Sequence, residues 1–178
     1  ERLVKWSEGK SIIWNVIECT RINNPARRPQ PVEVKAEVWM SIIHGSRGII
    51  YFVHQFKPRF MEAALLADKE MLEAVTEINA RVLSLAPVIN CGTERKDIDV
   101  ATVNGLPVAL TALIYEDGLY IFTVNMRGEN TDASFSLPGI KAGSKIEVLD
   151  ENRKITAEKN LIRDRFKPWE VHLYMSKL

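Results

Sequence analysis

One carboxylate of the sequence stands where it could do chemistry. Glu18 ends the apolar run SIIWNVIE, and Arg21, Arg27 and Arg28 follow it in a polar loop. A carboxylate at the end of a buried strand can act as an acid, a base or a nucleophile on a ligand that reaches it. The structural alternative is an ion pair between Glu18 and Arg21 or Arg28. Arg27 and Arg28 could also bind an anionic sugar, although a solvated loop is the simpler interpretation.

A second group of polar side chains follows another apolar run. The run GIIYFV is followed by HQF, which places Tyr51, His54, Gln55 and Phe56 at or just beyond the end of a strand. An imidazole and an amide can hydrogen-bond hydroxyl groups, and Tyr51 or Phe56 offers a flat ring for stacking. The structural alternative is that the polar groups bond to nearby backbone.

Composition excludes several other classes of site. Lys and Arg total 24 against 23 Asp and Glu, so overall charge favours neither nucleic acid nor an anionic membrane as a partner. Cys19 and Cys91 are the only cysteines, and no Cys/His spacing of a zinc site occurs, so we expect neither a disulfide framework nor a bound metal or cofactor. No apolar run reaches the roughly 18 residues of a membrane span. The sequence gives no indication of localisation.

Two strand–helix pairs must position these side chains. The runs 11–19 and 48–53 are rich in β-branched residues, as in strands of a parallel sheet that are covered on both faces. A helix is expected from Pro31 to Gly45 and another from Asp68 to Pro87, because apolar residues recur there at three- and four-residue steps. A short helix should end before Gly9.

The pattern changes to a period of two after about residue 97. Alternating apolar residues flank the turn EDG at 116–118 and recur at 133–137, 146–148 and 169–175. This indicates an antiparallel β-sandwich at 97–178, after an α/β segment at 1–90 and a linker between them. Three tryptophans lie on core patterns, namely Trp14, Trp39 and Trp169, and His172 should be a surface or inter-sheet residue.

The whole series of motifs resembles one known architecture. PxEVKAEVWMSIIHGSRGIIYFVHQF, then DKEMLEAVTEINARVLSLAPVI, then an alternating β region that closes with FKPWEVHLYM, is similar to the C-terminal part of (β/α)8-barrel glycoside hydrolases of the clan A type with an appended β-sandwich. The resemblance implies the last two strand–helix units of such a barrel. The chain starts at Glu1 rather than Met, so we expect it to be part of a longer protein.

The resemblance also implies roles for the strand-end residues. Active sites of these barrels lie at the carboxyl ends of the strands. Glu18 would stand at the position of the catalytic nucleophile, with Tyr51, His54, Gln55 and Arg21 as sugar-binding residues. The acid/base carboxylate of such enzymes belongs to an earlier strand, so the chain alone should lack glycosidase activity.

The sequence leaves two alternative functions and indicates that other strands must complete the sheet. The chain is either the C-terminal portion of a glycoside-hydrolase-like protein that acts on carbohydrate, or a noncatalytic sandwich that binds carbohydrate or braces a neighbouring domain. Two parallel strands with two helices cannot cover both faces of the sheet or pair both of its edges. We therefore expect a homo-oligomer, or a missing N-terminal barrel portion that completes the sheet.

Overall fold

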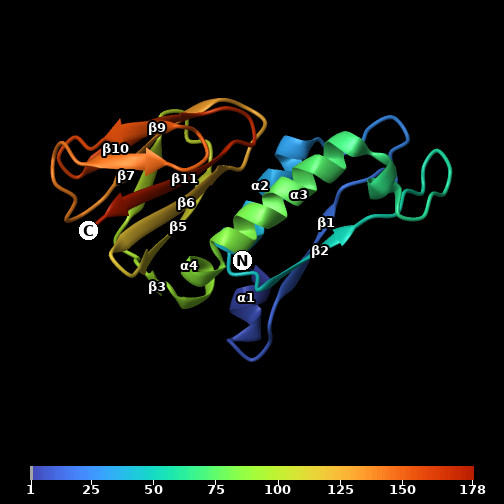
Figure 1. Cartoon of the computed structure of the whole chain (residues 1–178), viewed down its shortest axis with the longest axis horizontal. Coiled ribbons are helices and arrows are strands. Elements are labelled where there is room, and N and C mark those ends of the chain that lie inside the picture. The colour runs from blue at the N-terminus through green and yellow to red at the C-terminus, as the bar shows by residue number, and fades with distance from the viewer. Residues whose placement is uncertain (1) are drawn as a thin grey trace. The chain divides into compact units, whose positions relative to one another are not determined.

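The chain divides into two compact units, of which the first ends at Leu83 and the second begins at Ser84 (Figure 1). The computed structural model describes residues 2–178, and Glu1 lies outside the described residues. The class expected from the sequence, mixed helix and sheet with antiparallel sheets, is confirmed. Within residues 2–178, no helix is both long and apolar enough to cross a membrane.

The first unit contains one pair of parallel strands and the longer helices. In chain order its elements are α1 (Arg2–Ser7), β1 (Trp14–Glu18), α2 (Pro31–Ile43), β2 (Gly48–Phe52), the 3-10 helix η1 (Ala64–Ala67) and α3 (Lys69–Ser84). β1 and β2 run parallel, with Trp14 opposite Gly48 and Glu18 opposite Phe52. Apart from η1, these elements follow the order that the sequence predicts.

Side chains at the helix ends explain where the helices begin and end. The Glu33 carboxylate accepts a hydrogen bond of 2.7 Å from the backbone N–H of Gln30, just before α2 starts. Asp68 does the same for α3, because its Oδ1 accepts from the N–H of Met71 at 3.2 Å. After α2 the chain reverses at Gly45, whose φ of +86° favours glycine.

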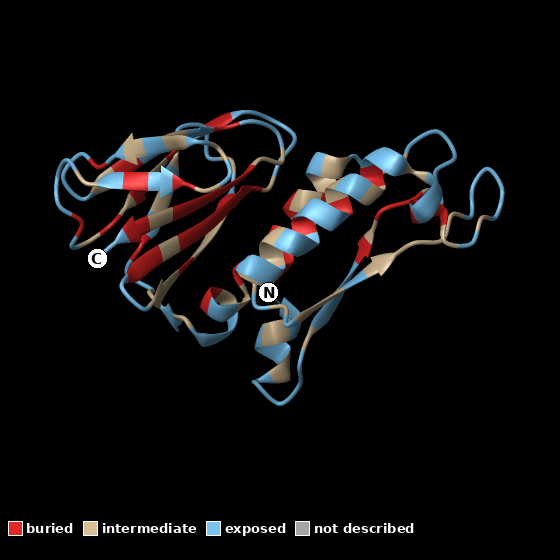
Figure 2. Cartoon of the chain, viewed as in Figure 1, coloured by how far each residue is buried: buried red, intermediate tan, exposed pale blue. Residues whose placement is uncertain are grey.

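The core of the first unit lies on one face of its sheet. Side chains alternate between the faces of a strand, so Ile17 of β1 and its neighbour Tyr51 of β2 point to the same side. Both helices cover this side. Its buried residues are Ile17, Cys19, Val34, Val38, Leu65, Met71, Val75 and Ile78, and Figure 2 shows α3 with buried and exposed stripes.

The other face of the same sheet is bare. Trp14, Val16 and Ile50 are 60%, 55% and 46% exposed, although the sequence predicts strands covered on both faces and Trp14 in a core. Figure 2 shows the first part of β1 in the exposed colour. The expectation for Trp14 is wrong for a simple reason: the two longer helices, α2 and α3, pack on the opposite face of the sheet. Trp39 of α2 is fully buried, as expected.

The second unit is built from one short helix and two antiparallel sheets. The three-stranded sheet has the order β10-β7-β4 and the six-stranded sheet the order β3-β5-β6-β11-β8-β9. Its elements are α4 (Ala86–Cys91), β3 (Thr93–Glu94), β4 (Asp99–Thr102), β5 (Val108–Tyr115), β6 (Gly118–Asn125), β7 (Thr131–Ser136), β8 (Lys145–Val148), β9 (Arg153–Thr156), β10 (Leu161–Phe166) and β11 (Val171–Lys177).

The core of the second unit lies between these sheets. Phe135 of β7 packs against Phe166 of β10 and Tyr174 of β11, with ring centroids 6.2 Å and 5.9 Å apart. Leu119 and Ile121 of β6 belong to the same buried cluster. The expected hairpin is present as β5 and β6, with Glu116 at φ +53° in its turn.

Three details differ from the sequence-based expectation. The linker expected between residues 90 and 97 contains β3, which pairs with β5, so the second unit begins earlier than residue 97. Trp169 does not extend β11; it stands in the preceding turn at φ +58° and is half-buried. Strands β4, β9 and β10 have no counterpart in the expected strands. In β10 the inward-facing residues include the charged Asp164, which interrupts the apolar alternation.

Candidate functional site

Glu18 lies on the bare face of the β1–β2 sheet, at the carboxyl end of β1. Its neighbour on that face is Phe52, the last residue of β2. The Glu18 Oε1 accepts one hydrogen bond, from the backbone N–H of Ile22 at 3.3 Å. The ion pair with Arg21 or Arg28 that the sequence allows is absent from the described residues; Arg28 instead pairs with Asp68 and Glu70. The Glu18 carboxylate is half-exposed and retains accepting capacity.

Tyr51 lies on the opposite side of the sheet from Glu18. Its hydroxyl donates a hydrogen bond of 2.9 Å to Oδ1 of Asn79 on α3. Burial, with a smaller contribution from the nearby Cys19, raises the pKa of Tyr51 to about 12. The ring therefore joins the strand to the helix layer and does not face a ligand that reaches Glu18.

His54 and Gln55 are held by the loop that follows β2. His54 Nδ1 accepts a hydrogen bond from the backbone N–H of Ala63 at 3.3 Å. Gln55 forms an isolated β-bridge with Met61, and its Nε2 donates to the carbonyl of Arg59 at 3.4 Å. Both side chains thus have the backbone partners of the structural alternative, and His54 Nε2 remains without a hydrogen bond to the described residues.

Aromatic rings surround the end of β2. Phe52 lies 5.9 Å from both His54 and Phe56, while Phe60 lies 6.3 Å from His54 and 5.7 Å from Phe56, measured between ring centroids. Phe56 and Phe60 are 46% and 62% exposed. We call Glu18, Phe52, His54, Phe56 and Phe60 the strand-end cluster. Phe60 is not predicted from the sequence; the spacing FKPRF, one aromatic four residues after another in a loop, is the signal that could have indicated it.

Arg21 and Gln55 meet elsewhere, at a cavity of about 560 Å³ formed by the loops after β1 and β2. Neither Glu18 nor Tyr51 nor His54 lines this cavity. The five residues predicted as one site are therefore divided. Glu18 and His54 belong to the strand-end cluster, Arg21 and Gln55 line the cavity, and Tyr51 faces α3. The residues around the cavity are Cys19, Thr20, Arg21, Arg28, Gln55, Pro58, Arg59, Met61, Ala64, Ala67, Asp68 and Lys69.

Cys19 is a buried thiol among the residues that line the cavity. It is buried, its Sγ donates to the carbonyl of Phe52 at 3.1 Å, and burial raises its pKa to about 11, helped by the nearby charges of Glu18 and Asp68. Cys91 is exposed. Because the thiolate is the reactive form, a thiol-reactive disulfide reagent at pH 8 should modify Cys91 and leave Cys19 intact in the folded chain.

The same shift predicts how stability depends on pH. The unfolded thiol ionises near pH 9 and the folded one near pH 11, so the folded state holds the proton more tightly. The contribution of Cys19 to the free energy of unfolding is complete below pH 9 and decreases as the pH rises from 9 to 11.

The labelling experiment has its own control. After unfolding, the unmodified chain should take up a second equivalent of the thiol reagent, and Cys19→Ser should not. Modification of both thiols in the native chain would contradict the burial of Cys19.

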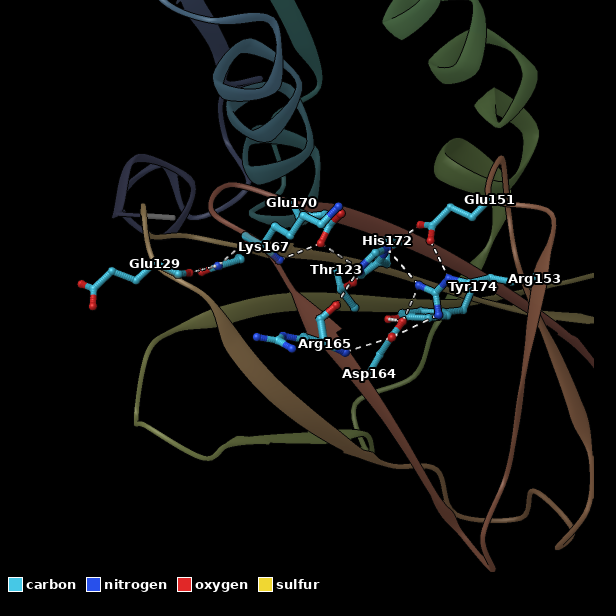
Figure 3. A network of polar contacts seen from close by, with 11 residues as sticks. Thr123, Glu129, Glu151, Arg153, Asp164, Arg165, Lys167, Glu170, His172 and Tyr174 are labelled. Atoms are coloured by element: carbon cyan, nitrogen blue, oxygen red, sulfur yellow. Dashed lines mark hydrogen bonds and ion pairs between the residues drawn. The ribbon is translucent and has the colours of Figure 1, made fainter.

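A second polar group lies between the two sheets of the sandwich (Figure 3). Asp164 of β10 accepts two hydrogen bonds from Arg153 of β9, at 3.1 Å and 2.7 Å, and a third at 2.9 Å from the hydroxyl of Tyr174 on β11. Arg153 also donates to Glu151 at 2.6 Å. His172 contacts Glu151 through Nδ1. We call these five residues the inter-sheet polar cluster.

The electrostatics of the inter-sheet polar cluster favour a structural role. Burial, then the charge of Asp164, raises the pKa of Tyr174. Burial disfavours the charged form of Arg153, but hydrogen bonds to Asp164 and Glu151 outweigh it and raise the pKa of that guanidinium. His172 is the inter-sheet residue that the sequence allows, buried and with Nε2 3.1 Å from the carbonyl of Arg165. Each residue of the cluster has a hydrogen-bond or ion-pair partner within the sandwich, so we assign the cluster a role in joining the two sheets.

No metal site accompanies either group. The described residues contain no cluster of three or more His, Cys, Asp or Glu side chains that could hold a metal ion.

The sequence matches no protein-family model and no curated protein. Its fold does match solved structures. The alpha-amylase of Geobacillus thermoleovorans, solved with acarbose, aligns with 99% of this chain at a TM-score of 0.62 and 11% identity. An alpha-amylase of Anoxybacillus aligns with 99% at a TM-score of 0.60 and 14% identity, and AmyP, solved with maltose, with 98% at 0.63 and 10%.

At 10–14% sequence identity, these matches show similarity of fold. The chain spans 42%, 40% and 42% of the length of the three proteins. The resemblance to glycoside hydrolases that the sequence predicts is therefore confirmed at the level of the fold.

Proposed function

We propose that this chain supplies the last two strand–helix units of a (β/α)8 barrel, followed by a C-terminal sandwich, to a glycoside-hydrolase-like protein that acts on carbohydrate. The observation that carries the proposal is the bare apolar face of the β1–β2 sheet. In a (β/α)8 barrel the helices cover the outside of the strands, while the inward side chains pack against those of other strands. Trp14, Val16 and Ile50 occupy such inward positions and lack that packing.

The solved structures support this interpretation. Three carbohydrate-active enzymes contain the fold of nearly the whole chain within about two fifths of their own length. The remaining strands of the barrel would cover the bare face and pair with the free edges of β1 and β2. They come either from another part of a longer protein or from further copies of this chain.

The strand-end cluster is the part of the sugar site that this chain provides. In the barrels that it resembles, ligands bind at the carboxyl ends of the strands, where Glu18 stands. The apolar faces of sugar rings can stack on exposed aromatic rings such as Phe56 and Phe60. Glu18 serves as one catalytic carboxylate and His54 as a hydrogen-bonding group, while Tyr51 holds β2 against α3.

Hydrolysis needs a second carboxyl group that the two strands do not offer. The two carboxyl groups of a retaining glycosidase stand about 5 to 5.5 Å apart, and those of an inverting enzyme about 6.5 to 9.5 Å. Glu18 is the only carboxylate in the strand-end cluster. The chain alone should therefore not hydrolyse aryl glycosides above the background rate, and turnover that disappears in Glu18→Gln would contradict this.

The sugar site itself is tested by binding. Isothermal titration of maltotriose should show weak, millimolar binding to the chain, and Phe60→Ala should weaken it at least fivefold because a stacking contact contributes about 1 kcal/mol. Leu66→Ala is the matched control, since Leu66 is an exposed apolar residue of η1, in the same connection between β2 and α3 as Phe60. Absence of binding at high millimolar maltotriose, or equal binding by Phe60→Ala, would contradict the assignment.

The second candidate is a sandwich that braces a neighbouring domain without binding sugar. A bracing domain must keep its own shape, and the inter-sheet polar cluster holds the two sheets of the sandwich together. A sandwich that binds sugar would need aromatic rings in an exposed row, and four of its aromatic residues do not form one: Phe166 and Tyr174 are buried and Tyr115 and Tyr120 half-buried. A chain that is fully folded but binds no maltotriose would favour this bracing role over a sugar site at the strand ends.

A further inference from the structure

The cavity between the loops after β1 and β2 is strongly basic. Of its lining residues, Arg21, Arg28, Arg59 and Lys69 are basic and only Asp68 is acidic. Its volume of about 560 Å³ falls within the range of small-molecule sites, roughly 300 to 1,000 Å³. The overall charge of the chain is only +1, so this excess is local.

Ion pairs account for only one of the four cations. Arg28 is held by Asp68 at 2.9 Å and by Glu70 at 2.5 Å. The side chains of Arg21, Arg59 and Lys69 have no hydrogen bond or ion pair with any residue from 2 to 178. Three basic residues without an ion pair among residues 2–178 thus line one cavity.

Arg21 is the least easily explained of the three. Arg59 and Lys69 are exposed and solvated, whereas Arg21 is half-buried. A partly buried arginine with no acceptor among residues 2–178 has its hydrogen-bonding groups available, and an anion in the cavity would bind to them through charge-assisted hydrogen bonds. The fork of an arginine also fits the two oxygens of a carboxylate or the oxygens of a phosphate.

We infer that this cavity binds the anionic group of a ligand, with Arg21 as the principal contact and Arg59 and Lys69 as supporting charges. The polar groups around it suit a sugar acid, because Gln55 can hydrogen-bond hydroxyls beside the charged group. The choice of a sugar acid rests on the proposed function; the anion site does not. The shared chemistry is a carboxylate or a phosphate group.

The test uses isothermal titration of the whole chain with galacturonate, galactose and inorganic phosphate at low ionic strength. We expect galacturonate to bind at least about tenfold more tightly than galactose, which has the same ring without the charge. Arg21→Gln should weaken galacturonate binding at least about tenfold, and added salt should weaken it in the unmodified chain. Phosphate that binds as tightly as galacturonate and is also lost in Arg21→Gln would support the anion site and assign phosphate as its ligand.

Arg47→Gln is the matched control, because Arg47 is an exposed arginine just before β2, at the opposite end of the strand. Its affinity for galacturonate should stay within about twofold. Equal binding of galactose and galacturonate, no binding of either anion, or equal affinities in Arg21→Gln and the unmodified chain would each overturn the inference. None of these outcomes bears on the proposed neutral-sugar site, which is tested separately with maltotriose and Phe60→Ala.

Discussion

Asp164→Ala should lower the free energy of unfolding of the sandwich by about 3 kcal/mol, which is a large part of the stability of an ordinary domain. Asp164 is 11% exposed in its side chain and accepts hydrogen bonds from both Arg153 and Tyr174. Its removal leaves the Tyr174 hydroxyl buried without this acceptor and Arg153 without its bidentate partner. Loss of a buried acceptor costs more than the bond itself contributed, because the remaining donors stay desolvated.

The measurement must report on the sandwich alone, because the chain has two compact units. Hydrogen exchange followed by mass spectrometry gives protection for peptides that cover β10 and β11, so the loss can be located there. Asp99→Ala is the matched control: Asp99 is an exposed carboxylate on β4 of the same three-stranded sheet, and its loss should change protection by less than about 0.5 kcal/mol. Equal protection in Asp164→Ala and Asp99→Ala would show that the inter-sheet polar cluster does not hold the sheets together.

A double-mutant cycle separates the two partners of Asp164. Tyr174→Phe alone removes one donor and should cost about 1 kcal/mol, and the cost should nearly vanish when Asp164 is already alanine.

Asp164 also explains why the alternation of apolar and polar residues predicts some strands of the sandwich and not others. Alternation of apolar and polar residues predicts β5 and β6, because their inner positions carry Ala112, Leu119 and Ile121. In LIRDRF the inner positions are Ile162, Asp164 and Phe166, so the apolar period is interrupted by a charge that only tertiary partners can satisfy. Helices α2 and α3 are predicted because the helical spacing of their apolar residues and the residues typical of helix ends indicate the same segments.

The candidate site is predictable in part for a different reason. That Glu18 and Tyr51 stand near strand ends follows from the lengths of two apolar runs. Which face each side chain occupies depends on the register between β1 and β2, and the register places Tyr51 beside Ile17 and Glu18 beside Phe52. A shift of one residue would exchange the faces, and nothing in either run alone fixes that choice.

Self-association of the isolated chain is the other large effect that we expect. The bare face of the β1–β2 sheet presents Trp14, Val16 and Ile50 to solvent, and each strand leaves one backbone edge unpaired within residues 2–178. Apolar surface next to free strand edges promotes pairing with another chain. Without other barrel strands, further copies are the available cover, and the buried surface should be on the order of 2,000 Å² or more in total.

The double substitution Val16→Lys with Ile50→Lys should weaken this association at least about a hundredfold. Val16 and Ile50 are opposite each other in the register and share the bare face, so two ammonium groups would have to be buried side by side at the interface. Both positions are exposed in the single chain, so the substitutions should leave its circular dichroism unchanged. Val103→Lys, at an exposed apolar residue of the sandwich, is the control and should associate as the unmodified chain does.

Light scattering over a micromolar concentration series gives both the affinity and the stoichiometry. A (β/α)8 barrel needs eight strands and each chain offers two parallel ones, so four copies arranged head to tail would close a barrel, whereas a dimer joined edge to edge would bury less of the bare face. Either assembly should dissociate in the double lysine variant. A well-folded unmodified chain that stays monomeric and monodisperse would show that Trp14, Val16 and Ile50 tolerate water, and the bare face would then no longer support an incomplete barrel.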